Sequence, residues 1–411
     1  MQAIRQFFRD LTLVPQGIIV VIAAFLPIIA IVAMGPAVPA MIGHFANDPE
    51  ARGKVPAMIG APGLAMALLG PFVGFAVDRF GRRPLLLLAT FAYGFFGAAP
   101  LLLNNLDQIY YSRLLLGVSE TGILTIVNTL IGDYWDDAGR KNWLFLQGLL
   151  GPFLAGLVAY MVGLASKLQW NGVFYVYLVA IPIFFAMMVW LFEPTARDSD
   201  MAGNQPGKAR LGLGDWLRAF PWANAVQIAS VTFFTALLYY VFIINGSLVF
   251  AEVGVHDSAR YAALIFIPQL FILLGAALFR LLANRSHILQ IIVFLVLMGA
   301  GLAGIGLAHS VSAMVGALLV QQTAAGMTVP VLIAWTQTKF GFANRGLGMG
   351  IWTSSFFLAQ SQSPRLVHII DAQMGGMQYA FLVAGIAGMA GALIGLVIFA
   401  ARSGFRTSAP V

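Results

Sequence analysis

The sequence contains no cysteine, and only 9% of its 411 residues are charged. The absence of cysteine excludes disulfide bonds, thiol nucleophiles and cysteine-ligated metal sites. Soluble domains carry about a quarter charged residues, so water is not the main solvent of this chain. The sequence also lacks the G-x-x-x-x-G-K-[ST] loop and the H-E-x-x-H zinc motif, and its five histidines are dispersed. We therefore expect no enzyme site, no metal and no cofactor, and no use of ATP as energy source.

Hydrophobic residues make up 60% of the chain, in continuous blocks long enough to cross a bilayer as helices of about 20 residues. Inside lipid the backbone must satisfy its own hydrogen bonds, which leaves helices or a closed barrel. Barrel strands would alternate over segments of about 10 residues, and these blocks do not. The sequence therefore predicts an all-α membrane protein with about twelve transmembrane helices. We expect helices at residues 17–42, 56–77, 84–103, 109–132, 143–165, 172–192, 222–249, 259–281, 288–308, 311–336, 346–367 and 376–401.

The longest hydrophilic stretch runs from Glu193 to Arg218 and is rich in Gly, Pro, Asn and Asp. Such a composition is typical of a flexible linker. We predict an N-terminal six-helix bundle over 1–193, a cytoplasmic linker over 194–218, and a C-terminal six-helix bundle with a short tail over 219–411. Two parallel repeats around a central cavity are a known plan of transporters.

The formal net charge is +7, but the basic residues are scattered among the loops rather than gathered into a patch. We interpret them as topology signals and expect no nucleic-acid partner. With both termini in the cytoplasm, the outer loops keep few basic residues, namely Arg52, Lys54, Lys167 and Arg260. The positive-inside rule therefore predicts two cytoplasmic termini. We expect a multi-pass monomer in a bacterial-type inner (plasma) membrane.

The loop after the second predicted helix reads Gly74-Phe-Ala-Val-Asp78-Arg79-Phe-Gly81-Arg82-Arg83. It resembles the signature loop of the major facilitator superfamily, G-x-x-x-D-R-x-G-R-R, at every defining position. Three shorter fragments are similar to the same family: Arg113 with Gly117, Asp133 with Arg140, and Glu193 with Thr195 and Arg197. The resemblance implies the fold of that family and a cytoplasmic gate formed by Gly74, Asp78, Arg79, Gly81, Arg82, Arg83, Asp133, Arg140 and Arg345. The simpler interpretation is that the arginines only anchor the loop at the membrane surface.

A partial motif bears on the direction of transport. Gly148, Gly151, Pro152 and Gly156 resemble the antiporter motif of drug:proton exchangers, G-x-x-x-G-P-x-x-G-G, although Gln147 replaces its first glycine and Ala155 a later one. The resemblance implies export in exchange for protons. Generic close packing of small residues between helices is the alternative.

Glu120 is the acidic residue that falls in the middle of a predicted helix, where an ionised carboxylate is costly. Arg113 lies two turns earlier on the same face, about 10 Å away. We predict that Glu120 exchanges the coupled proton and that Arg113 tunes it or binds an anionic group. The pattern is similar to that of Spinster-like members of the superfamily. A buried structural pair is the alternative for both residues.

Other candidates are polar or aromatic side chains at membrane depth, some of which should line the substrate cavity. We name Gln147, Asn245, Gln269, Gln321, Gln322, Tyr239, Trp335 and Trp352. Hydrogen bonds between helices, or packing, are the alternative for each. Arg365, His368 and Asp371 cluster at one end of a predicted helix, and we interpret them as a gate or an interface anchor.

Together these features predict a secondary active transporter that works by alternating access in the lipid bilayer. We expect proton-coupled export of a small amphipathic organic compound, so that its partners are a small-molecule substrate and protons. Proton-coupled uptake of a small organic anion, held by Arg113, is the close alternative. A lipid-moving or sensor protein on the same scaffold is the remote one.

Overall fold

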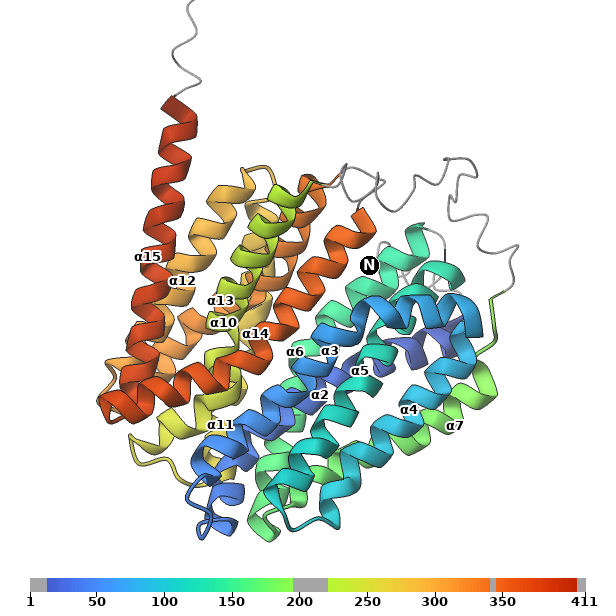
Figure 1. Cartoon of the computed structure of the whole chain (residues 1–411), viewed down its shortest axis with the longest axis horizontal. Helices are drawn as coiled ribbons and strands as arrows, with labels where there is room; N and C mark the ends of the chain where they lie inside the picture. Colours follow the sequence, from blue (N-terminus) through green and yellow to red (C-terminus); the bar gives the residue numbers. More distant parts are fainter. Residues whose placement is uncertain (1–12, 136, 195–220, 341–344, 405–411) are drawn as a thin grey trace, which may run out of the picture.

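The computed structural model describes residues 13–135, 137–194, 221–340 and 345–404 (Figure 1). These residues form helices and no strand, which confirms the all-α class. The α-helices are α2 (Val14–His44), α3 (Ala51–Phe80), α4 (Arg82–Ala98), α5 (Leu106–Tyr134), α6 (Asp137–Leu168), α7 (Ala180–Trp190), α10 (Trp222–Ala251), α11 (Ser258–Leu281), α12 (His287–Gly306), α13 (Val311–Lys339), α14 (Arg345–Met374) and α15 (Met377–Gly404). Two 3₁₀ segments, η1 (Ala99–Leu101) and η2 (Gly172–Val179), extend α4 and precede α7.

The membrane character of the helices confirms the transmembrane prediction. In the described part of the chain, 11 helical spans are long and apolar enough to cross a bilayer. The remaining long helix, α14, has 30 residues but a low hydrophobicity, because its middle reads Thr-Ser-Ser and Gln-Ser-Gln-Ser. Polar side chains at this depth need partners or water, so α14 must lie against protein rather than lipid along much of its length.

The helix bounds lie close to the predicted ones, with two differences. Helix α14 continues to Met374 rather than ending at 367, because Asp371 is held by Arg52 of α3 and not placed in a surface loop. The sixth predicted helix begins with the 3₁₀ segment η2 before α7 starts at Ala180. Short 3₁₀ runs at helix starts are common because they need fewer residues per turn.

The helices pack as two groups. Helices α2 to α7 contact mostly one another, as do helices α10 to α15, and α3, α6, α11 and α14 make the main contacts between the groups. Figure 1 shows α12, α13 and α15 at the left and α4, α5 and α7 at the right. We call the membrane face with Gly81, between α3 and α4, the signature face. The face with Phe45, between α2 and α3, is the opposite face.

Glycines allow the two groups to meet closely near the opposite face. A Cβ atom on Gly60 or Gly63 of α3 would lie 2.8 or 2.6 Å from backbone carbonyl oxygens of α14. A Cβ atom on Gly163 of α6 would lie 2.7 Å from Ala262 of α11. Any larger side chain would force the backbones apart. The α3–α14 and α6–α11 pairs therefore close the structure toward the opposite face.

Candidate functional site

A cavity of about 440 Å³ lies between the two groups of helices. Helices α2 and α6 supply one wall, and α10, α11 and α13 supply the other. Its size falls within the range of about 300–1,000 Å³ that holds drug-sized ligands. The lining is Phe25, Ile28, Val32, Gly35, Pro36, Gln147, Gly151, Pro152, Ala155, Tyr239, Phe242, Ile243, Tyr261, Ile265, Gln269, Ile272, Gln322, Ala325, Gly326, Val329 and Pro330. We call this space the central cavity.

The polar groups of the central cavity are amides and phenols. None of its lining residues, among those the structure describes, carries a charge. The Oε1 atoms of Gln147 and Gln269 are buried and have no hydrogen-bond partner in the described part of the chain. Buried acceptors without a partner are costly, so a ligand or water must supply donors to these two oxygens.

Prolines add further acceptors to the same walls. Pro36 of α2 and Pro330 of α13 lie inside their helices and line the central cavity. A proline has no N–H, so the carbonyl four residues earlier loses its helical donor. Those carbonyls belong to Val32 and Gly326, which also line the cavity. The cavity thus offers hydrogen-bond acceptors in an apolar frame.

The predicted cavity residues divide into two sets. Gln147, Gln269, Gln322 and Tyr239 line the central cavity, and the structure places Asn245, Gln321, Trp335 and Trp352 elsewhere. Asn245 donates to the Val241 carbonyl of its own helix, and Gln321 packs against Gly301 of α12. Trp335 packs beside Lys339, and Trp352 stacks on Phe356. The spacing of polar residues along one helix does not show which neighbouring helix each of them faces, so the sequence could not separate the two sets.

Three aromatic residues that line the central cavity were not predicted from the sequence. Phe25 of α2, Phe242 of α10 and Tyr261 of α11 all line it. Tyr261 is buried. In a chain with 32 phenylalanines, no local signal separates a cavity ring from a packing ring.

Glu120 lies in a second, much smaller cavity. Its side chain is 3% exposed, and its Oε1 atom has no hydrogen-bond partner in the described part of the chain. We call the space beside this side chain the Glu120 chamber, and its volume is about 10 Å³. That is room for about one water molecule. The chamber is lined by Ala30, Ile31, Met34, Met58, Ile59, Pro62, Arg113, Leu116, Glu120, Tyr177 and Gln360.

Arg113 is held mainly by the backbone at the end of α4. Its Nη2 atom donates to the carbonyl oxygens of Phe96 and Gly97, at 2.7 and 2.8 Å. Its guanidinium lies 5.1 Å from the ring centre of Phe174 and 4.9 Å from that of Tyr177. Its Nη1 atom is buried without a partner, and it forms no ion pair with Glu120 within the described residues. One trapped water could join the two side chains, since both line the chamber.

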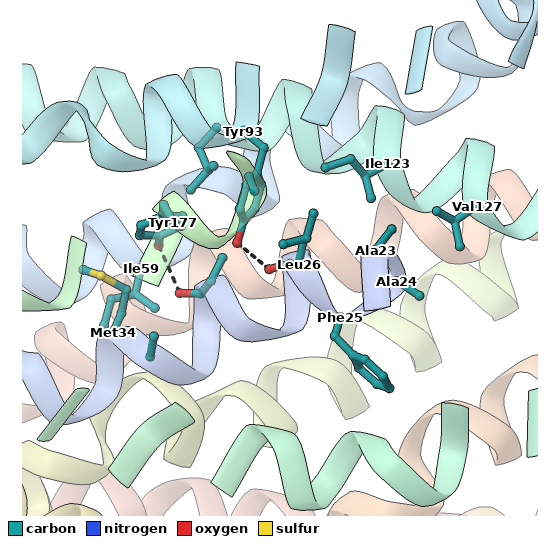
Figure 2. Packing of buried hydrophobic residues seen from close by; sticks show 14 of the residues in the cluster. Ala23, Ala24, Phe25, Leu26, Met34, Ile59, Tyr93, Ile123, Val127 and Tyr177 are labelled. Atoms are coloured by element: carbon teal, nitrogen blue, oxygen red, sulfur yellow. Dashed lines mark hydrogen bonds between the residues drawn. The ribbon is translucent and has the colours of Figure 1, made fainter. Parts of the chain in front are cut away.

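Helix α2 separates the central cavity from the Glu120 chamber. Figure 2 shows Tyr93 and Tyr177 on one side of α2 and Phe25 pointing to the other. The hydroxyl of Tyr93 donates to the Leu26 carbonyl at 2.6 Å, and that of Tyr177 donates to the Ala30 carbonyl at 3.3 Å. These bonds fix α2 against α4 and η2. The two spaces therefore lie on opposite faces of one anchored helix.

The predicted gate residues lie at the signature face. Arg82 forms an ion pair with Asp133 of α5, with 3.2 Å between Nε and Oδ2, and Arg79 is exposed. Gly81 has a φ of 91°, which favours glycine in this turn. The side chains of Gly74, Asp78, Arg140 and Arg345 lie outside the described part of the structure.

Glu193 ties the end of the first group to the signature turn. Its carboxylate accepts from the backbone N–H groups of Arg82 and Arg83, at 2.7 Å each. An acid at the first turn of α4 satisfies free N–H groups and complements the helix dipole. Arg83 in turn donates to the carbonyl of Met188 at 2.8 Å. Thr195 and Arg197, from the same fragment, lie outside the described residues.

The antiporter-like residues lie where α6 meets other helices. A Cβ on Gly151 would touch Phe25 of α2 at 3.1 Å, and one on Gly156 would touch Phe266 of α11 at 3.2 Å. Gly151 and Pro152 also line the central cavity. Gly148 lies in α6, but its surroundings are outside the described part.

Two ion pairs join the groups at the opposite face. Arg52 of α3 and Asp371 of α14 lie 3.3 Å apart between Nε and Oδ2. Lys167 of α6 and Asp257, before α11, lie 3.1 Å apart between Nζ and Oδ2. Arg365 and His368 are exposed on α14. Within the predicted cluster, Asp371 links the groups by an ion pair, and the His368 ring lies against Gly53 of α3.

Comparisons with known proteins agree with this architecture. The sequence profile of the Major Facilitator Superfamily matches residues 20–294. The efflux pump dotC of Dothistroma septosporum is 28% identical over 162 residues, 38% of this chain and 26% of that protein. The class B tetracycline resistance protein of Escherichia coli is 25% identical over 208 residues, 49% of this chain and 50% of that protein. The chain thus spans between a quarter and a half of the length of these relatives.

Solved structures share the fold at low sequence identity. The nucleoside transporter NupG has a TM-score of 0.75 at 13% identity, over 93% of this chain and 99% of that one. A D-xylose-proton symporter has a TM-score of 0.71 at 15% identity, over 93% of this chain and 96% of that one. The family profile covers more than half of the sequence, and the fold matches over nearly its whole length. The chain therefore belongs to the Major Facilitator Superfamily.

Proposed function

We propose that the protein exports a small, uncharged amphipathic organic compound in exchange for protons, by alternating access. The observation that carries this proposal is the central cavity, whose described lining is apolar and uncharged but presents unpartnered amide oxygens from both helix groups. A charged ligand would lose its hydration there without gaining a counter-charge. A neutral compound with hydrogen-bond donors gains both apolar contact and partners.

Further features support the proposed direction of transport and a mechanism in which the two helix groups move against each other. The partial antiporter motif lies on a cavity wall, and the relatives include proteins named as an efflux pump and tetracycline resistance proteins. Helices α2–α7 and α10–α15 would rock about the central cavity as two bundles, linked by the cytoplasmic segment and with both termini inside. If the signature face is the cytoplasmic one, as the basic residues predict, the closed contacts at the opposite face would correspond to a state that faces the cytoplasm.

Glu120 is proposed as the group that carries the coupled proton. It lies at mid-membrane on α5, buried and without an ion-pair partner among the described residues. A neutral carboxyl is far less costly there than a carboxylate. Arg113, seven positions earlier, would limit that cost when the proton leaves.

The alternative of organic-anion uptake finds less support in this geometry. Arg113 does not line the central cavity. Two of its donor bonds go to backbone carbonyls, and its flat face is covered by Phe174 and Tyr177. An anion in the central cavity would meet no positive side chain among the described residues.

Two probes with one scaffold test the substrate class. N-phenyl-1-naphthylamine is neutral and has an N–H donor, and 8-anilino-1-naphthalenesulfonate adds a sulfonate to the same rings. We expect the neutral probe, and not the anion, to bind the purified protein and raise its melting temperature.

Matched glutamine variants locate the binding. Gln269→Met removes a cavity acceptor and should weaken binding of the neutral probe by about 0.5–1.5 kcal/mol, up to about tenfold in Kd. Gln321→Met, on a helix face that meets α12, should leave the affinity unchanged. Equal binding of the two probes, or a loss confined to Gln321→Met, would show that the central cavity is not the site.

A further inference from the structure

The surroundings of Glu120 show a feature that the central cavity does not explain. A third cavity, of about 210 Å³, lies between α3, α5 and α14, on the side of the Glu120 chamber nearer the signature face. Its lining is Met66, Gly70, Thr121, Leu124, Thr125, Gly350, Thr353 and Phe357. None of these residues lines the central cavity. We call this space the threonine cavity.

The threonine cavity is suited to water. It is large enough for several water molecules, since one occupies about 30 Å³ in the liquid. The hydroxyls of Thr121 and Thr353 donate to carbonyls of their own helices, at 2.7 and 2.9 Å. Their oxygen lone pairs remain able to accept from water. Such a row of hydroxyls supports a short chain of water beside Glu120.

The helices around this cavity diverge toward the signature face. A Cβ on Gly63 of α3 would lie 2.6 Å from the Phe357 carbonyl of α14. On Gly70, two turns further along α3, the nearest atom would be Thr353 Cγ2 at 4.0 Å. A Cβ on Gly350 of α14 would meet nothing within 4 Å in the described part. The α3–α14 contact is therefore tight beside Glu120 and loosens toward the signature face.

Gln360 of α14 closes one side of the Glu120 chamber, next to α3. It is 4% exposed, lines the chamber, and donates from Nε2 to the Ile59 carbonyl of α3 at 3.3 Å. Beyond it, Gly60 packs on the Gln360 backbone, and the Arg52–Asp371 ion pair lies about 16 Å further along α14. Gln360 thus belongs to one helix group and covers an acid that belongs to the other.

The threonine cavity and the Glu120 chamber lie next to each other along α14. Phe357 lines the first and Gln360 the second, and they are about one helical turn, or roughly 5 Å, apart. The titratable groups near Glu120 are Arg113 on its own helix, Tyr177 of η2, Tyr93 of α4 and Tyr240 of α10. Helices α2, α3 and α14 present uncharged side chains to the chamber.

We propose that protons reach Glu120 by a path separate from the substrate: they travel through the threonine cavity from the signature face, and Gln360 seals the chamber against the opposite face. When α3 and α14 part, Gln360 leaves with α14 and the chamber opens to the other side. The substrate would cross on the far side of α2, through the central cavity. The inference rests on the proposed role of Glu120 as carrier of the coupled proton.

Single cysteines test the water path, because the native sequence has no competing thiol. Thr353→Cys probes the threonine cavity, while Phe80→Cys and Asn104→Cys mark the signature and opposite faces. We expect a membrane-impermeant maleimide to label Thr353→Cys from the Phe80 side and not from the Asn104 side. Adding Gln360→Ala should leave maleimide labelling confined to the Phe80 side, because Gly60, Gly63 and the Arg52–Asp371 pair still close α3 against α14, but it should let protons reach Glu120 from the Asn104 side. A Thr353→Cys thiol that is unreactive from both sides, or reactive from the Asn104 side with Gln360 intact, would overturn the proposal.

A second readout follows the proton itself. The infrared carbonyl band of a protonated carboxyl that disappears in Glu120→Gln reports Glu120, and a pH jump on the Phe80 side should change it rapidly. Capping Thr353→Cys with a bulky maleimide should abolish the rapid change, and capping Ala325→Cys in the central cavity should not. The reverse result would overturn the separate path and leave the coupling role of Glu120 standing. A carbonyl band that never changes with pH would refute both the separate path and the coupling role of Glu120. A band that does change with pH, together with normal coupled transport by Glu120→Gln, would refute the coupling role alone.

Discussion

Adding one methyl group at Gly63 should shift the transporter toward opening at the opposite face. An alanine Cβ there would lie 2.6 Å from the Phe357 carbonyl oxygen and 2.8 Å from Gln360 Cβ. Ordinary contact begins at 3.4 Å, so α3 and α14 must separate by about 0.8 Å. Overpacking of this kind costs about 1–3 kcal/mol. Because the cost falls on the closed state, its population relative to an open state should drop by about 5- to 150-fold.

Distance measurements between spin labels follow this shift. Labels on Glu50→Cys and Met374→Cys, at the ends of α3 and α14 on the opposite face, should report longer distances in Gly63→Ala. Gly70→Ala is the matched control, because its Cβ would meet Thr353 Cγ2 at 4.0 Å, an ordinary contact. Identical distance distributions in Gly63→Ala and the parent would refute the assignment of α3–α14 as the closing contact. An equal shift in Gly70→Ala would refute it too.

Two further predictions concern charged groups outside the membrane core. The backbone N–H of Arg260, followed by Lys167, lowers the pKa of the Asp257 carboxyl. The pairing of Asp257 with Lys167 is therefore fully present above the ordinary pKa of about 4 and is lost as the pH falls further, through the lowered pKa. Spin labels across α6 and α11 should therefore show loosening at acid pH, and Lys167→Met should remove that pH dependence while leaving the folded state intact. Glu193→Ala removes the hydrogen-bond acceptor at the start of α4 and should lower the free energy of unfolding by about 0.5–2 kcal/mol, measured by thermal unfolding. Glu193→Gln keeps one acceptor oxygen and should lose less stability. Equal losses in the two variants would contradict a capping role.

The sequence predicted the helices well, because a membrane span needs a continuous apolar block whose length is set by the bilayer. It also placed Glu120 at mid-membrane, where an acid is conspicuous among apolar neighbours. The extension of α14 to Met374 was missed, since the stabilising partner of Asp371 is Arg52, which lies more than 300 positions away.

The walls of the cavities were harder to predict. Gln147 and Gln321 are similar side chains at similar depth, yet one lines the central cavity and the other packs on α12. The difference depends on which helix faces each residue, and one sequence does not contain that information. Gln360 shows the same limit, because its importance comes from meeting Ile59 and the Glu120 chamber in the other helix group.

The central claim is that Glu120 couples proton movement to substrate movement. The most direct measurement is uptake of N-phenyl-1-naphthylamine into protein-containing vesicles under an imposed pH gradient, for the parent and for Glu120→Gln. The account predicts that the parent accumulates the probe in the more acidic compartment, because protons that leave it drive the probe in. The variant should still exchange probe across the membrane but should lose all response to the gradient. Gradient-driven accumulation by Glu120→Gln at the parental level would contradict the account.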